Sequence, residues 1–153
     1  MGDNMRKYLC RDIFLIGILA GAVLTTDIVA QTVIVNAEPV LITETESIDY
    51  TDDVDSAIME YLFDQGYIIF SQSSEDSVET LRALGKQTGA DIVISWAMHV
   101  NRLSGILIDC ETGRHSPPLF VNQSEFGSEA DLHKMYSQMG SRLCEQLIQE
   151  DWN

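Results

Sequence analysis

The stretch Ala90–Val100, ADIVISWAMHV, decides the fold. Apolar residues occupy both of its alternating faces, which point to opposite sides of an extended chain. One face holds Ile92, Ile94, Trp96 and Met98, and the other holds Val93, Ala97 and His99. Strands that are apolar on both faces usually lie inside a sheet and are covered on each side. We therefore expect a central strand here, covered at least in part on both faces.

The residues after this strand predict further strands. Asn101-Arg102 is a short link, and Leu103–Cys110 is an antiparallel hairpin partner. Glu111-Thr112-Gly113 turns the chain, because Thr and Gly favour turns. Ser116-Pro117-Pro118 interrupts pairing, so we expect Leu119–Ser124 to form a last edge strand.

The residues before the central strand alternate between helix and strand. Apolar residues at helical spacing predict a helix that begins near Asp52 and stops at Gly66. Tyr67–Phe70 is a compact apolar strand, and Ser71–Ser77 is a polar loop. A second helix runs from Val78 to Gly89.

The two ends of this region are predicted less sharply. Val40–Thr43 is a β-prone run after a proline, and Thr32–Val35 extends it or precedes it as an edge strand. A long helix opens at Ser128 with a cap-like serine and an acid at Asp131, and its apolar stripe reaches Leu147.

These elements give the order β-α-β-α-β-β-(β)-α. Such an alternation predicts an α/β fold, bordering on α+β, with a mixed sheet in two or three layers. We expect a single domain over residues 31–153.

Residues 1–30 have the plan of a secretory signal peptide. The uncharged run Ile13–Leu24 follows Arg6, Lys7 and Arg11, and a small residue stands at Ala30. Twelve residues of helix rise only about 18 Å, which is short of a bilayer core of about 30 Å. We expect cleavage between Ala30 and Gln31 and a periplasmic or secreted protein. The alternatives are an uncleaved membrane anchor and a buried amino-terminal helix.

The net charge of −15 on 153 residues excludes some partners. Residues 1–30 hold three basic and three acidic residues, so the expected domain carries all of this charge. Nucleic-acid binding requires a basic surface, and the longest basic cluster is Arg6-Lys7. We therefore expect no nucleic-acid partner, and membrane contact only through an uncleaved signal segment.

Two segments resemble a bacterial envelope family. Leu84–Ser95 contains Gly85, Gly89, Ala90 and Asp91, and is similar to a "LG…tGAD-hydrophobic" signature. Leu107–Gly113 contains Asp109, Thr112 and Gly113, and is similar to an "L-[IV]-D-V-E-T-G" hairpin. Both occur in the α/β domain shared by the amino-terminal domain of TolB, the curli-secretion lipoprotein and FlgO-like proteins. The resemblance implies an envelope protein that acts by protein contact.

The chain departs from that family in two respects. It has no lipobox cysteine after the apolar run, because Cys10 precedes it, and no long alternating hairpin for a membrane pore. The resemblance therefore implies a fold and a compartment, and not transport or secretion.

Motifs that carry chemistry are missing. The sequence contains no C-x-x-C, H-E-x-x-H, G-x-S-x-G or G-x-G-x-x-G. We therefore name no catalytic residue, cofactor or metal ligand. A disulfide between Cys110 and Cys144 is one hypothesis for an exported chain, and two buried free thiols are the other.

Three functions remain open at this point. The preferred one is a non-enzymatic envelope domain that presents a sheet edge or a helix face to a protein partner whose identity is unknown. The second is a small-ligand-binding or hydrolytic domain that uses the carboxyl ends of its strands, near Ser71, Ser95 and His99. The third is an inner-membrane-anchored protein that retains residues 1–30.

Overall fold

The structure is a computed structural model that describes residues 30–38, 50–127 and 131–149. The predicted signal segment, the run Val40–Thr43 and the helix start at Ser128 lie outside the described residues. In chain order the elements are β1 (Thr32–Ala37), α2 (Thr51–Asp64), β2 (Ile68–Ser73), α3 (Val78–Thr88), β3 (Ile92–His99), β4 (Arg102–Asp109), β5 (Leu119–Asn122), the 3₁₀ helix η1 (Gln123–Phe126) and α4 (Leu132–Gln149).

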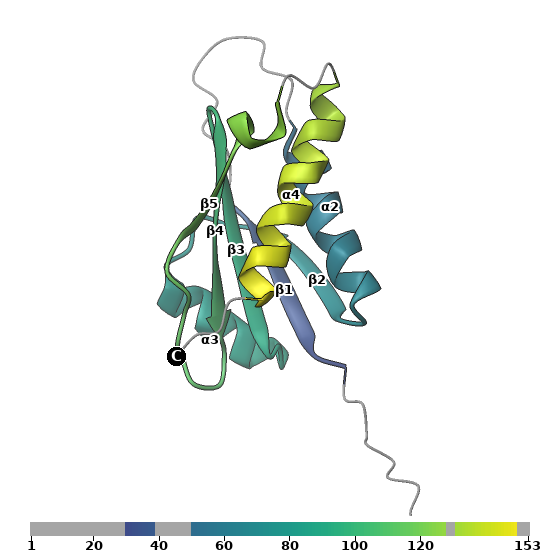
Figure 1. Ribbon diagram of the computed structural model, residues 1–153. Coiled ribbons are helices and arrows are strands. Elements are labelled where there is room, and N and C mark those ends of the chain that lie inside the picture. The colour runs from purple at the N-terminus through teal and green to yellow at the C-terminus, as the bar shows by residue number, and fades with distance from the viewer. Residues whose placement is uncertain (1–29, 39–49, 128–130, 150–153) are drawn as a thin grey trace, which may run out of the picture.

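One five-stranded mixed sheet carries the fold (Figure 1), with the strand order β2-β1-β3-β4-β5. β1 is parallel to β2 and to β3, whereas β4 is antiparallel to β3 and to β5. Helices α2 and α4 cover one face, and α3 covers part of the other. This confirms the α/β class, the element order and the three-layered form. It also confirms β3 as an inner strand and β4 as its hairpin partner.

Each face of the sheet has its own apolar cluster. Val33 and Val35 of β1 face α2 and α4 in the larger cluster, while Ile34 faces α3 in the smaller one. The core of the larger cluster includes Trp96, which is only 1% exposed. The alternation of β1 side chains thus divides the interior into two halves.

The position of β1 corrects one prediction. One of the two alternatives for Thr32–Val35 was an edge strand, but β1 lies between β2 and β3 and continues to Ala37. A short apolar run does not reveal its neighbours. Here the parallel pairing on both sides buries every residue from Val33 to Ala37.

The prediction that a loop begins at Ser71 was wrong. β2 continues through Ser71, Gln72 and Ser73, because these residues remain in register with Val35–Ala37 of β1. Conversely, the strand expected over Leu119–Ser124 ends at Asn122. The Glu125 carboxylate accepts the backbone N–H of Asn122 at 2.9 Å and starts η1 there.

Helix ends follow local chemistry. Ser77 caps α3, since its hydroxyl accepts the N–H of Thr80, and Gly89 ends α3 with φ +76°. The Asp131 carboxylate accepts the N–H of Lys134 at 3.3 Å, so α4 is capped by Asp131 and begins at Leu132. Within the described ranges, no helix combines the length and the apolar character needed to cross a bilayer.

Candidate functional site

The residues that resemble the envelope family hold α3 against the strands. Gly85 lies against Cys110, and a Cβ at position 85 would overlap its Sγ atom. The N–H of Ala90 donates to Gly85 O at 2.8 Å, next to the left-handed Gly89. The Asp91 carboxylate accepts the N–H of Thr32 at 2.7 Å and so fastens the start of β1. These four motif residues therefore have structural roles.

The second family-like segment is also structural. Asp109 Oδ1 accepts the N–H of Thr112 at 2.9 Å, and these hydrogen bonds hold the pKa of Asp109 below its ordinary value. Gly113 has φ +77°, and a Cβ there would overlap the guanidinium of Arg82. Arg82 in turn donates to the carbonyl oxygens of Cys110 and Glu111. The turn is thereby locked onto α3.

Cys110 and Cys144 are free buried thiols in the structure. Cys110 belongs to the α3-side cluster and Cys144 to the cluster beneath α2 and α4. The sheet lies between these clusters, so the structure does not support the disulfide hypothesis. Burial raises the pKa of Cys144 to about 12 and also raises the pKa of Cys110, so neither thiol is activated.

The carboxyl ends of β1 and β3 hold a closed polar network. Asn36 is fully buried, and its amide nitrogen donates to Ser95 Oγ at 3.1 Å and to Ser74 O at 3.2 Å. Its carbonyl oxygen accepts from Gln72 Nε2 at 3.1 Å and from Ser74 Oγ at 2.9 Å. Both donors and both acceptor positions of Asn36 are thus engaged within the protein.

Ser71, Ser95 and His99 do not converge on one site. Ser95 belongs to the Asn36 network, and His99 Nε2 lies 2.9 Å from Ser104 Oγ on the exposed β3–β4 hairpin. Ser71 instead donates to Asp55 Oδ2 at 3.2 Å, while Trp96 Nε1 donates to Asp55 Oδ1 at the same distance. Burial raises the pKa of Asp55, and the two hydrogen bonds oppose that shift.

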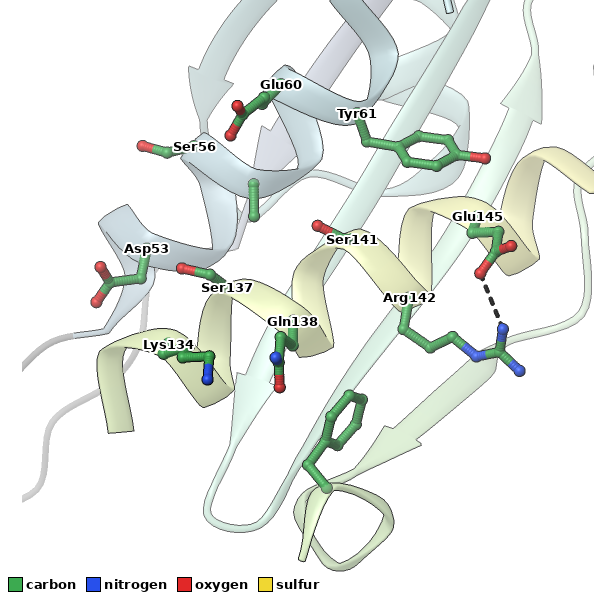
Figure 2. A pocket seen from close by; sticks show the side chains of 12 residues that line it. Asp53, Ser56, Glu60, Tyr61, Lys134, Ser137, Gln138, Ser141, Arg142 and Glu145 are labelled. Atoms are coloured by element: carbon green, nitrogen blue, oxygen red, sulfur yellow. Dashed lines mark hydrogen bonds and ion pairs between the residues drawn. The ribbon is translucent and has the colours of Figure 1, made fainter. Parts of the chain in front are cut away.

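An open groove of about 620 Å³ runs between α2 and α4 (Figure 2). The side chains labelled in Figure 2 include both acidic and basic residues, and Arg142 forms an ion pair with Glu145 at 2.8 Å. The residues that line it are Asp53, Ser56, Ala57, Glu60, Tyr61, Phe126, Lys134, Ser137, Gln138, Ser141, Arg142 and Glu145. This mixture of paired charges and hydroxyl groups favours no single ligand chemistry.

An aromatic cluster lies where α2 and α4 begin, beside Asp53 of the groove. Asp53 Oδ2 lies 2.7 Å from His133 Nδ1 and joins the start of α2 to the start of α4. Tyr50 stacks on Tyr136 with ring centroids 4.5 Å apart, and meets the His133 ring edge-on at 5.1 Å. The His133 side chain is 61% exposed, and no serine of the described residues is hydrogen-bonded to it. The Asp53–His133 pair thus connects α2 to α4. Among the described contacts, no nucleophilic side chain is bonded to His133.

The edge strand β2 exposes large apolar side chains. Ile68 is 50% exposed and Phe70 is 54% exposed. They stand opposite Thr32 and Ile34 of β1, and therefore lie on the face that α3 covers. Helix α3 packs over β3 and β4, so it leaves Ile68 and Phe70 half-exposed.

Helix α2 flanks the same edge on the other face. Asp52, Asp55, Met59 and Phe63 recur at three- and four-residue intervals and form one stripe. The bond between Asp55 and Ser71 places this stripe on the β2 side of α2. Phe63 is the most exposed phenylalanine of the described residues, at 73%. We call the outer edge of β2, together with Phe63, Ile68 and Phe70, the β2 surface.

The opposite edge of the sheet is protected. β5 has only four residues, it follows Pro117-Pro118, and Phe120 lies beneath the Arg102 guanidinium at 4.8 Å. Short length, nearby proline and covering charge are the usual means of preventing strands from pairing with other chains. β2 has six residues and contains neither a charged residue nor a proline. Among the described strands, it pairs only with β1.

Comparison with known proteins shows distant likeness only. No family model matches the chain, and no curated protein matches it. The structure is similar to the PelC dodecamer from Paraburkholderia phytofirmans, with 15% identity, a TM-score of 0.46, and coverage of 76% of this chain and 86% of that chain. It is also similar to the LpoB C-terminal domain from Salmonella enterica, with 14% identity, a TM-score of 0.40, and coverage of 61% and 83%.

A third similar structure is the lipoprotein GNA1162 from Neisseria meningitidis. It has 13% identity and a TM-score of 0.43, with coverage of 77% of this chain and 96% of that chain. Likeness of this degree carries no inference about function. The resemblance of Leu84–Ser95 and Leu107–Gly113 to the TolB and curli-secretion family stays a prediction from the sequence.

Proposed function

We propose that this chain is a non-enzymatic protein-binding domain of the bacterial cell envelope, and that it binds its partner through the β2 surface. The observation that carries the proposal is the contrast between the two edges of the sheet. β5 is short and covered by Arg102, whereas β2 is longer, uncharged, and bordered by exposed Phe63, Ile68 and Phe70. Edge strands of this second kind pair readily with other chains.

The structural hydrogen bonds of the polar residues favour protein binding over catalysis. Ser95 is used in the Asn36 network, Ser71 is bonded to Asp55, and the family-like residues around Gly89 shape a turn. A site for nucleophilic catalysis needs a nucleophile within hydrogen-bond reach of a base that a third group orients. The described hydrogen bonds do not assemble such a set at the carboxyl ends of the strands. A ligand-binding or hydrolytic domain is therefore the weaker proposal.

Photo-crosslinking in cells tests the binding surface. A benzoylphenylalanine introduced at Phe63 or Phe70 is expected to give one discrete adduct, whose second component mass spectrometry identifies. Matched controls carry the same group at Phe120 of β5 and at Val100 of the β3–β4 hairpin, which are 46% and 88% exposed. Equal adducts from all four positions, or none from Phe63 and Phe70, would contradict the proposal.

The envelope location has its own test. We propose export through residues 1–30, with Gln31 as the first residue of the exported protein. Amino-terminal sequencing after cell fractionation checks this directly. Intact residues 1–30 in the membrane fraction would favour the anchored alternative instead.

A further inference from the structure

We infer that the β2 surface binds an extended segment of a partner protein in which cationic and apolar residues alternate, and that this segment adds a sixth strand beside β2. This inference rests on the proposed function and specifies the partner. Its first basis is the direction of the backbone groups of β2. The N–H of Ile68 donates to Gln31 O at 2.9 Å, toward β1. Successive backbone groups of a strand point to alternate sides, so those of Ile69 and Ser71 point to the outer edge.

The second basis is that the two sides of an added strand would meet different surfaces. On the α3 side, its side chains would lie beside Ile68 and Phe70, which are apolar and half-exposed. On the α2 side, they would lie beside the stripe that contains Asp52, Asp55 and Phe63. Because side chains of a strand alternate between its faces, one set should be apolar and the other cationic.

Lysine or arginine suits the α2 side for three reasons. Their charge complements exposed Asp52, their aliphatic stems cover apolar surface such as Met59, and their cationic groups are attracted to the ring face of Phe63. The chain as a whole carries a net charge of −15, which attracts cationic partners at long range. Charge therefore favours a basic segment over an acidic one.

A second copy of the chain fits this edge less well. Antiparallel pairing of β2 with β2 of another copy would place two α2 helices side by side on one face of a continuous sheet. Both copies would carry the same net charge of −15, and chains of like charge repel one another. The negative charge of the chain therefore favours a different, basic chain as the occupant.

The test uses three synthetic peptides of eight residues and the purified chain. The probe alternates lysine and valine, the first control has the same composition in two blocks of four, and the second control replaces lysine by glutamate. Amide hydrogen exchange followed by NMR gives the readout. With the alternating probe, we expect new protection at the N–H groups of Ile69 and Ser71. The N–H groups of Ile68 and Phe70 already point toward β1, so their protection should change little.

A proline substitution separates strand pairing from simple apolar contact. Ser71→Pro removes an outward N–H without removing a bond to β1, whereas Ser71→Ala removes only the hydroxyl bonded to Asp55. Loss of one backbone hydrogen bond predicts that S71P weakens probe binding by up to about tenfold, whereas S71A should weaken it by less than about threefold. Circular dichroism and unfolding midpoints verify that both variants fold.

Several results would contradict the inference, and each concerns either the added strand or its occupant. Equal binding of the block peptide, preferred binding of the glutamate peptide, or exchange protection confined to other residues overturns the added strand. A dimer that forms without peptide and dissociates in S71P makes a second copy the occupant and also overturns the inference. If crosslinks at Phe63 and Phe70 persist in those cases, the proposed protein-binding function stands and only the kind of partner segment is wrong.

Discussion

Gly140 of α4 lies directly against the backbone of Val54 in α2. A Cβ at position 140 would be 2.8 Å from Val54 O and 3.2 Å from Val54 Cα. Real Cβ atoms do not approach a carbonyl oxygen this closely, so the absence of a side chain sets the distance between the two helices. This contact holds α4 against α2, the helix that borders the β2 surface.

Gly140→Ala is therefore expected to destabilise the protein, although alanine normally favours a helix. Overpacking of this kind costs about 1–3 kcal/mol of unfolding free energy. Chemical denaturation measures the loss. Ser141→Ala on the same helix is the matched control, and its effect should stay within about 0.5 kcal/mol because Ser141 borders the open groove. An increase in stability for G140A would contradict the close helix contact.

The Asn36 network predicts a second large loss. Asn36→Ala leaves Gln72, Ser74 and Ser95 without their partner, and it also opens a small cavity. Ser95 is the buried one of these partners, and an unsatisfied buried group costs about 1–3 kcal/mol, so together with the cavity we expect the unfolding free energy to fall by about 2 kcal/mol. Ser95→Ala removes one hydrogen bond and should cost less. If the two variants lose the same stability, Asn36 is not the centre of the network.

Asp55 predicts a pH dependence of stability. Burial raises its pKa in the folded protein above the ordinary value of 3.8, so the folded state holds the proton more tightly than the unfolded state. This contribution to stability is present in full below the ordinary value. It is lost as the pH rises through the interval up to the raised pKa.

Asp55→Asn isolates this effect, because asparagine keeps an oxygen for Trp96 Nε1 and carries no charge. The unfolding free energy of the wild type, relative to that of D55N, is expected to fall as the pH rises through that interval. Urea denaturation at a series of pH values provides the measurement. A constant difference, or one that grows with pH in favour of the wild type, would show that Asp55 does not have a raised pKa.

The two buried thiols are expected to react very slowly with a thiol reagent in the folded protein. Cys144 is fully buried with a pKa of about 12, and Cys110 is 2% exposed. A thiol reagent should leave both unlabelled in the folded protein and label both after unfolding without reductant. Peptide mapping by mass spectrometry distinguishes the two positions. Two unlabelled cysteines in the unfolded, unreduced protein would restore the disulfide hypothesis.

Local signals explain why much of the fold was predictable. Three elements are predicted by signals of only a few residues, and the structure confirms them. They are the strand around Ile94, the helix end at Gly89 and the turn at Gly113. The neighbours of β1 and the polar half of β2 were missed, because strand pairing depends on residues far apart in the sequence. Ser71 belongs to a strand only because Val35 lies beside it.

The β2 surface was only partly visible in the sequence. Phe63 carries a usable signal, since it falls outside the helical stripe that contains Val54, Ile58 and Leu62. Phe70 carries none: it ends a compact apolar run that is typical of a buried strand. Its exposure results from the placement of α3 over β3 and β4, which is decided by packing across the whole sheet.

This exposure makes a last prediction about Phe63 and Phe70. They are 73% and 54% exposed, so Phe63→Ser and Phe70→Thr remove only part of a phenylalanine's apolar area from the interior and should each cost less than about 2 kcal/mol. Trp96→Phe is the contrasting variant, because Trp96 is 1% exposed and donates to Asp55. Its loss should be the largest of the three. Thermal unfolding checks the order.

If F63S or F70T unfolds as readily as W96F, these side chains support the fold and are less exposed than described here. If both variants stay folded but lose crosslinking to the partner, their apolar surface is needed for binding and not for stability.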